Sequence, residues 1–93
     1  MNLDKAKKRI ANLVKKGFKG YPLISIAYFG ENPGQATEVV IQFKLEEEAE
    51  PQEQRFTSKT DAREDETIQT VIVKIIERAN VNSVVEIEGV SQL

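Results

Sequence analysis

The sequence predicts a single α+β domain over residues 1–93: a two-layer sandwich with two helices on one face of a four-stranded sheet. Apolar residues recur at helical spacing in two segments, and they alternate with polar residues, or run continuously, in four strand-like segments. The chain has 93 residues, of which 40% are hydrophobic and 30% charged. This length and composition are typical of one globular domain with one core.

Residues 3–17 have the period of an amphipathic helix. Asn2 or Asp4 can accept the free amide hydrogens of its first turn. Gly17 and Gly20 favour its end, because glycine tolerates the left-handed exit conformation. The apolar face, which we expect to face the core together with Phe18, contains Leu3, Ala6, Ile10, Leu13, Val14 and Gly17.

Residues 22–29 are almost entirely apolar, a pattern typical of strands covered on both faces, and we therefore place this predicted strand inside the sheet. The segment from Gly30 to Gly34, with Pro33, predicts a turn. Residues 36–46 then alternate as a half-buried antiparallel strand. Its expected inward residues are Val39, Ile41, Phe43 and Leu45.

Five glutamates between Glu46 and Gln54 predict a mobile acidic loop, since like charges repel and resist packing. Residues 54–60 predict a weaker strand, with Phe56 inward. Its polarity is typical of a sheet edge.

Residues 62–79 predict the second helix, with Asp61 and Glu64 as a capping box. Five β-branched residues between 71 and 76 keep a strand open as an alternative. Asn80 and Asn82 end the segment, and residues 83–90 predict a last strand with Val85 and Ile87 inward. The helical stripe contains Ile68, Val71, Ile72, Ile75, Ile76 and Ala79.

The element order is therefore α-β-β-β-α-β. A right-handed crossover lays the last strand parallel to the first, which gives a mostly antiparallel sheet of order 3-2-1-4. With both helices on one face, the other face of the first strand stays uncovered, and its apolar side chains predict a protein-binding or homodimer surface. Both faces of that strand are apolar, so the candidate partner-binding residues are Leu23, Ile24, Ile26, Ala27, Tyr28 and Phe29. The expected rim contains Glu38, Gln42, Glu86 and Glu88.

The chain has neither histidine nor cysteine, which excludes Ser-His-Asp and Cys-His catalysis, His/Cys metal sites and disulfides. The acidic clusters at 46–50 and 64–66 lie in predicted solvated positions, where carboxylates stay ionised. No glycine-rich turn opens a helix after a strand, so no nucleotide site is indicated. We expect a cytoplasmic protein that is not an enzyme and that holds no cofactor or metal.

Charge is segregated along the chain. Residues 1–20 carry seven cations and one acid, whereas residues 21–93 carry six cations and fourteen acids. The basic helix either lies near its own acidic body or contacts an anionic partner, so nucleic-acid binding is the alternative function. A membrane is not an expected partner, because docking would take the helix's apolar face out of the core. The candidate phosphate contacts are Lys5, Lys8, Arg9, Lys15, Lys16 and Lys19.

The order α-β-β-β-α over residues 3–80 resembles the double-stranded-RNA-binding domain. The run from Ser58 to Ala62 is similar to that family's serine-lysine-lysine-x-alanine entry to its second helix. The resemblance implies a helix start that grips phosphates, yet Glu64, Asp65 and Glu66 would repel them. No RNA-contacting role is therefore carried over to these residues.

Overall fold

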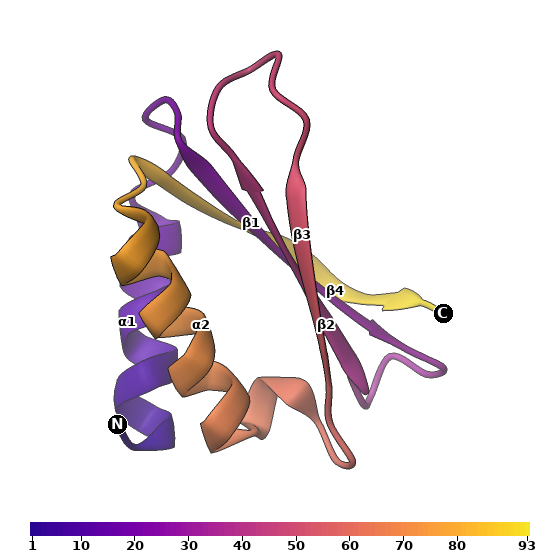
Figure 1. The fold of residues 1–93 in the computed structure, drawn as a ribbon. Helices are drawn as coiled ribbons and strands as arrows, with labels where there is room; N and C mark the ends of the chain where they lie inside the picture. The colour runs from indigo at the N-terminus through magenta and orange to yellow at the C-terminus, as the bar shows by residue number, and fades with distance from the viewer.

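The structure, a computed structural model, describes residues 1–93 as two helices and a four-stranded sheet (Figure 1). A short 3₁₀ turn precedes the second helix. The elements are α1 (Leu3–Lys15), β1 (Leu23–Gly30), β2 (Glu38–Lys44), β3 (Gln52–Thr57), the 3₁₀ turn (Ala62–Glu64), α2 (Glu66–Ala79) and β4 (Ser83–Gln92).

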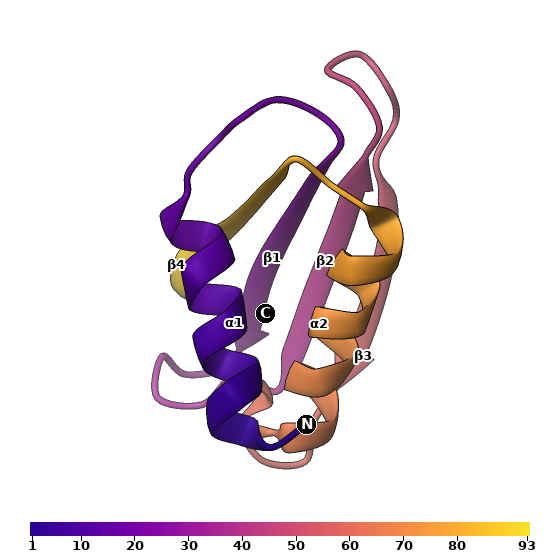
Figure 2. The same cartoon turned by 90° about the vertical axis from the view of Figure 1, so that its left-hand side faces the viewer.

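The sheet has the strand order β3-β2-β1-β4, which confirms the predicted order and the α+β class. The pairs β1–β2 and β2–β3 are antiparallel, and β1–β4 is parallel. Both helices cover the same face of the sheet, as Figure 2 shows with α1 and α2 in front of the strands. The opposite face is covered by no other element of the chain.

The core lies between the helices and the central strand β1. Ile24, Ile26 and Tyr28 point toward the helices and are 0%, 0% and 3% exposed. These three cannot contact a partner while the domain is folded, so their inclusion among the candidate partner-binding residues is corrected. The helices contribute Ala6, Ile10, Ile68, Ile72, Val73 and Ile76 to the same core.

Local signals explain where the helices begin and end. The Asn2 side chain accepts a hydrogen bond from the Lys5 amide at 2.9 Å, as an N-cap does. Helix α1 ends at Lys15, two residues earlier than predicted, and Gly17 follows with φ 73°. Phe18 lies outside the core and is 59% exposed, which overturns its expected inward position.

The segment 62–79 is helical, so the strand alternative is wrong. The structure divides this segment into the 3₁₀ turn and α2. Asp61 caps the 3₁₀ turn by accepting from the Arg63 amide, and Asp65 caps α2 by accepting from the Ile68 amide at 3.1 Å. Asn80 ends α2 in the left-handed conformation, with φ 50°. Two aspartate caps, four residues apart, therefore replace the single predicted helix start.

Strand β4 differs most from the prediction. Val84 is the core residue at 3% exposure, while Val85 pairs with Ser25 on the uncovered face. The β1–β4 register shifts between Ile26 and Tyr28, where Glu86 and Val90 are the partners. The intervening residues bulge outward around Gly89 at φ 76°, leaving Ile87 50% exposed.

The hairpin of β2 and β3 also shifts relative to the prediction. Strand β3 begins at Gln52, inside the segment predicted as an acidic loop, and ends at Thr57. Val39 and Ile41 are buried as predicted, at 0% and 2% exposure. Leu45 lies beyond the end of β2 and is 60% exposed, so its predicted inward position is wrong.

Candidate interaction surfaces

The uncovered face of the sheet carries a strip of apolar side chains. Leu23, Ala27 and Phe29 alternate with the core residues of β1 and are half-buried. The register places Val40 beside Ala27 and Val85 beside Ser25 on the same face. Val40 is only 5% exposed, so the accessible part of the strip comes from Leu23, Ala27, Phe29 and Val85. This strip is thus what remains of the six candidate partner-binding residues, extended by one valine from each neighbouring strand.

Charged residues border the strip on the β3 side. Arg55 bonds Glu38 at 3.4 Å and Glu53 at 3.3 Å, and all three point to the uncovered face. Of the predicted rim, Glu38 and Gln42 lie on this face, whereas Glu86 pairs with Ile26 and faces the helices. The position predicted for Glu86 is therefore wrong, and Glu88 lies in the exposed bulge.

A second surface is a groove of about 640 Å³ between α2 and the hairpin of β2 and β3. Its apolar lining comes from both layers: Ile41, Phe43 and Phe56 from the strands, and Val71, Ile75 and Ala79 from the helix. Gln52, Gln54, Lys74 and Arg78 complete it. Figure 1 shows α2 diverging from β2 and β3 on this side of the molecule.

The basic face of α1 forms a third surface. Lys5, Lys8, Lys15, Lys16 and Lys19 are exposed, and none is paired with a carboxylate. Lys16 is the C-cap of α1 and Lys19 lies in the loop that follows, so the prediction that these two belong to the helix is wrong. Arg9, the sixth candidate, bonds Glu77 of α2 at 3.2 Å. The acidic residues of segment 21–93 thus form an ion pair with only one of the six candidate phosphate contacts.

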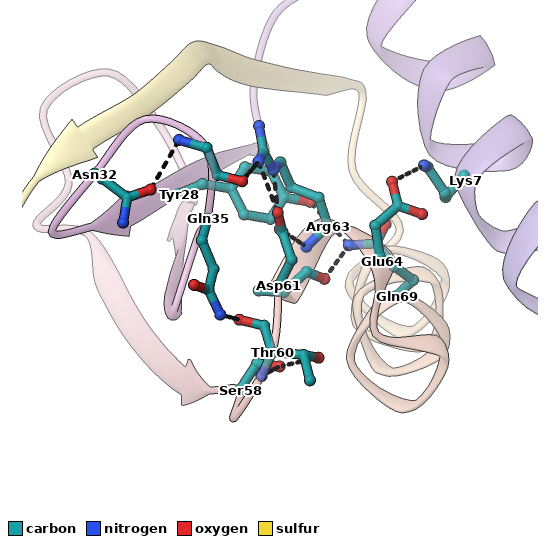
Figure 3. A network of polar contacts seen from close by, with 12 residues as sticks. Lys7, Tyr28, Asn32, Gln35, Ser58, Thr60, Asp61, Arg63, Glu64 and Gln69 are labelled. Atoms are coloured by element: carbon teal, nitrogen blue, oxygen red, sulfur yellow. Dashed lines mark hydrogen bonds and ion pairs between the residues drawn. The ribbon is translucent and has the colours of Figure 1, made fainter.

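A polar cluster ties the 3₁₀ turn to the rest of the domain (Figure 3). The Asp61 carboxylate accepts from Arg63 Nη2 at 2.7 Å and Nε at 2.9 Å, and Arg63 Nη2 also donates to the Gly34 carbonyl. Gln69 Nε2 donates to Tyr28 Oη at 3.0 Å and to the Ala62 carbonyl at 2.9 Å. These hydrogen bonds join the 3₁₀ turn to the Gly34 turn, to β1 and to α2.

The cluster also shifts the pKa values of its members. Hydrogen bonds from Arg63 lower the pKa of Asp61, and the same bond raises the pKa of Arg63. Burial raises the pKa of the Tyr28 hydroxyl, against a smaller opposite effect of the Gln69 hydrogen bond. Burial against the helices raises the pKa of Glu86. A tyrosine with a raised pKa is a poor acid at neutral pH, so the Tyr28 shift does not indicate acid–base catalysis.

The chain contains no group of three or more acidic, histidine or cysteine side chains positioned to hold a metal ion. Neither helix has the length and apolar character that crossing a bilayer requires. Compared with models of protein families, with curated proteins and with solved structures, the chain matches none of them.

The groove was missed in the sequence because its helical lining lies in the same stripe as the core. Ile72 and Ile76 are buried at 0% and 5%, while Val71, Ile75 and Ala79 are only half-buried. The signal was the breadth of the stripe, which exceeds what one sheet contact needs. The exposed aromatic ring of Phe18 was missed as well, since periodicity assigned it to the core.

Proposed function

We propose that the protein is a non-enzymatic protein-interaction module that self-associates through the uncovered face of its sheet. One observation carries this proposal: β1 is apolar on both faces, but the helices cover only one of them. Leu23, Ala27 and Phe29 remain on the other face beside Val40 and Val85. A contiguous apolar strip bordered by polar residues is typical of an interaction surface.

A second copy of the chain is the partner that fits this face. The face carries charges of both signs: Arg55 lies beside Glu38 and Glu53, and Lys44 lies at the opposite end of β2 from Glu38. A two-fold interface sets the same patch against itself, so mixed charges can pair acid with base across the axis. The apolar strip then packs at the centre of the interface, where desolvation stabilises it most.

Light scattering across a range of protein concentrations tests self-association. We expect the mean mass to rise toward that of a dimer, and Phe29→Asp to return it to that of a monomer. Phe18→Asp is the matched control, because it makes the same change at an exposed ring in the loop between α1 and β1, outside the sheet. Circular dichroism must show that both variants are folded, and a monomeric wild-type protein at millimolar concentration contradicts the proposal.

Nucleic-acid binding through α1 is the second candidate function. Two observations favour it: five exposed lysines have no acidic partner, and the exposed Phe18 lies in the chain between Lys16 and Lys19. Free cations neutralise phosphates, and an aromatic ring among them can stack on an unpaired base. This combination favours single strands over duplexes.

A titration with single-stranded oligonucleotides at low salt tests the second function. We expect affinity to fall steeply with salt and Phe18→Ala to weaken binding, at about 1–3 kcal/mol per stacked base. Lys15→Ala with Lys16→Ala should reduce the salt dependence, whereas Lys59→Ala, an exposed cation outside α1, should not. Absence of binding at low salt removes this function.

A further inference from the structure

We propose that the groove between α2 and β3 binds an extended, acidic segment of a partner protein, which adds to β3 as a fifth strand. The proposal deepens the interaction role proposed above at a different surface, and it does not depend on self-association. Three features of the groove carry it: an unpaired strand edge, an apolar lining and two free cations.

The first feature is the outer edge of β3. This strand ends the sheet, with β2 on one side only. Its backbone makes no hydrogen bond outside the sheet, and no side chain of the protein bonds it there. The Ser58 backbone N–H donates to the Thr37 carbonyl at 2.8 Å, so the backbone groups of Ser58 point toward β2. In an antiparallel pair, successive residues point their backbone groups alternately toward and away from the neighbouring strand. The backbone groups of Glu53, Arg55 and Thr57 therefore point away from β2. These groups can pair with an added strand.

The second feature is the apolar lining beside that edge. Gln52, Gln54 and Phe56 point from β3 to the helix side of the sheet, and Val71 and Ile75 of α2 form the opposite wall. A strand added to β3 projects every second side chain to the same side. Apolar side chains at alternate positions would therefore enter the groove and contact Val71 and Ile75.

The third feature is charge. Residues 21–93 carry fourteen acids and only six cations, yet the groove is lined by two of those cations and by no acid. Lys74 and Arg78 are exposed and form no ion pair, unlike Arg55 and Arg63. Groups of this kind attract a carboxylate, so the segment should carry an acidic side chain facing the groove.

The edge, the lining and the cations together select the chemistry of the occupant. A helix could use the apolar lining but would leave the edge of β3 unpaired. A nucleic acid could use the cations but would leave the apolar lining exposed. An extended segment with alternating apolar side chains and one groove-facing acid uses all three features.

The test is a titration of ¹⁵N-labelled protein with a synthetic peptide in which valine, valine and glutamate occupy alternate positions and threonine the others. We expect shifts confined to residues 52–57 and 71–79. Two versions methylated on alternate backbone nitrogens separate strand addition from simple groove filling, since only the set that faces β3 should lose binding. Loss in both versions, or in neither, overturns strand addition.

Variants of the protein then test the two cations of the groove and the outer edge of β3. Lys74→Glu with Arg78→Glu should weaken binding by about fivefold or more per lost ion pair, and Lys59→Glu should not. Glu53→Pro removes a backbone N–H that points away from β2, and an edge strand tolerates proline. This variant should not bind the peptide, whereas Glu53→Ala, which keeps the N–H, should bind it.

A failure of the proposed peptide binding is distinguishable from a failure of the proposed self-association. The Phe29→Asp variant should bind the peptide as well as the wild-type protein does, because Phe29 lies on the opposite face of the sheet. Shifts that instead cluster at Leu23, Ala27 and Phe29 place the peptide on the uncovered face and overturn the proposal. Absence of shifts at millimolar peptide overturns it too.

Discussion

Gln69 of α2 donates a hydrogen bond to the hydroxyl of Tyr28 of β1, 3.0 Å away and within the core. Gln69 is 3% exposed, and the same amide nitrogen also donates to the Ala62 carbonyl at 2.9 Å. One side chain thus ties the 3₁₀ turn, helix α2 and the central strand together. This contact ties the N-terminal half of α2 to the sheet, while the groove lies beside residues 71–79 toward the other end of the helix.

Gln69→Leu should destabilise the fold by about 2 kcal/mol or more, because it leaves the Tyr28 hydroxyl and the Ala62 carbonyl without their donor. Tyr28→Phe removes only one of the two bonds and should cost about 1 kcal/mol. Urea unfolding of both variants and of the double variant measures the coupling between the residues. Additive losses in the double variant would contradict the bond.

Gly30→Ala should destabilise the protein by about 1–3 kcal/mol, since an added Cβ would overlap the backbone carbonyl of Gln35. Gly34→Ala is the control, because a Cβ there meets only the Asn32 side-chain oxygen at 3.4 Å. Thermal unfolding compares the two variants. Equal melting temperatures would show that the turn after β1 is looser than the structure indicates.

Stability should fall in acid because of Asp61. Arg63 holds the pKa of the Asp61 carboxylate below its ordinary value of 3.8, so the folded state favours the ionised form. The stability gained from this shift is present above about pH 4 and is lost as the pH falls through the lower, folded-state pKa. Asp61→Asn should flatten this acid limb of the unfolding profile, whereas Glu47→Gln in the exposed loop should leave it unchanged.

Glu86 should affect the pH dependence of stability in the opposite direction to Asp61. Burial raises its pKa above the ordinary 4.5, so the folded state binds the proton more readily than the unfolded state. Stability then falls as the pH rises from 4.5 through the raised pKa, and the loss persists at neutral pH. Glu86→Gln should stabilise the protein at pH 7 but not below pH 4.5; Glu88→Gln, in the exposed bulge, is the control. The gain should be small, since the residue remains open to water.

The sheet order was predictable because it follows from β1. Its apolar run requires a central place, and the handedness of the crossover from β3 to β4 then leaves one arrangement. The uncovered face was not predictable, because Ile24 and Phe29 are both apolar and only packing against the helices distinguishes them. The bulge in β4 depends on the pairing of Glu86 and Val90 with β1, which no local pattern reveals; Gly89 was its only signal.

The groove and the basic face show a further limit of periodicity. A helical stripe does not separate core residues such as Ile72 from groove residues such as Ile75, because both lie on the same side of α2. A run of basic residues likewise does not reveal which of them form ion pairs. Lys7 pairs with Glu64 and Arg9 with Glu77, both distant in the sequence, whereas the neighbouring lysines form no ion pair. Both distinctions arise from tertiary contacts.

The central claim is that the uncovered face of the sheet is an interface between copies of this chain. The most direct test is a series of ¹⁵N–¹H correlation spectra recorded at rising protein concentration. The account predicts shifts at Leu23, Ala27, Phe29, Val40 and Val85 that disappear in the Phe29→Asp variant. Spectra that stay unchanged to millimolar concentration, or that change only along α1 or the edge of β3, would contradict it.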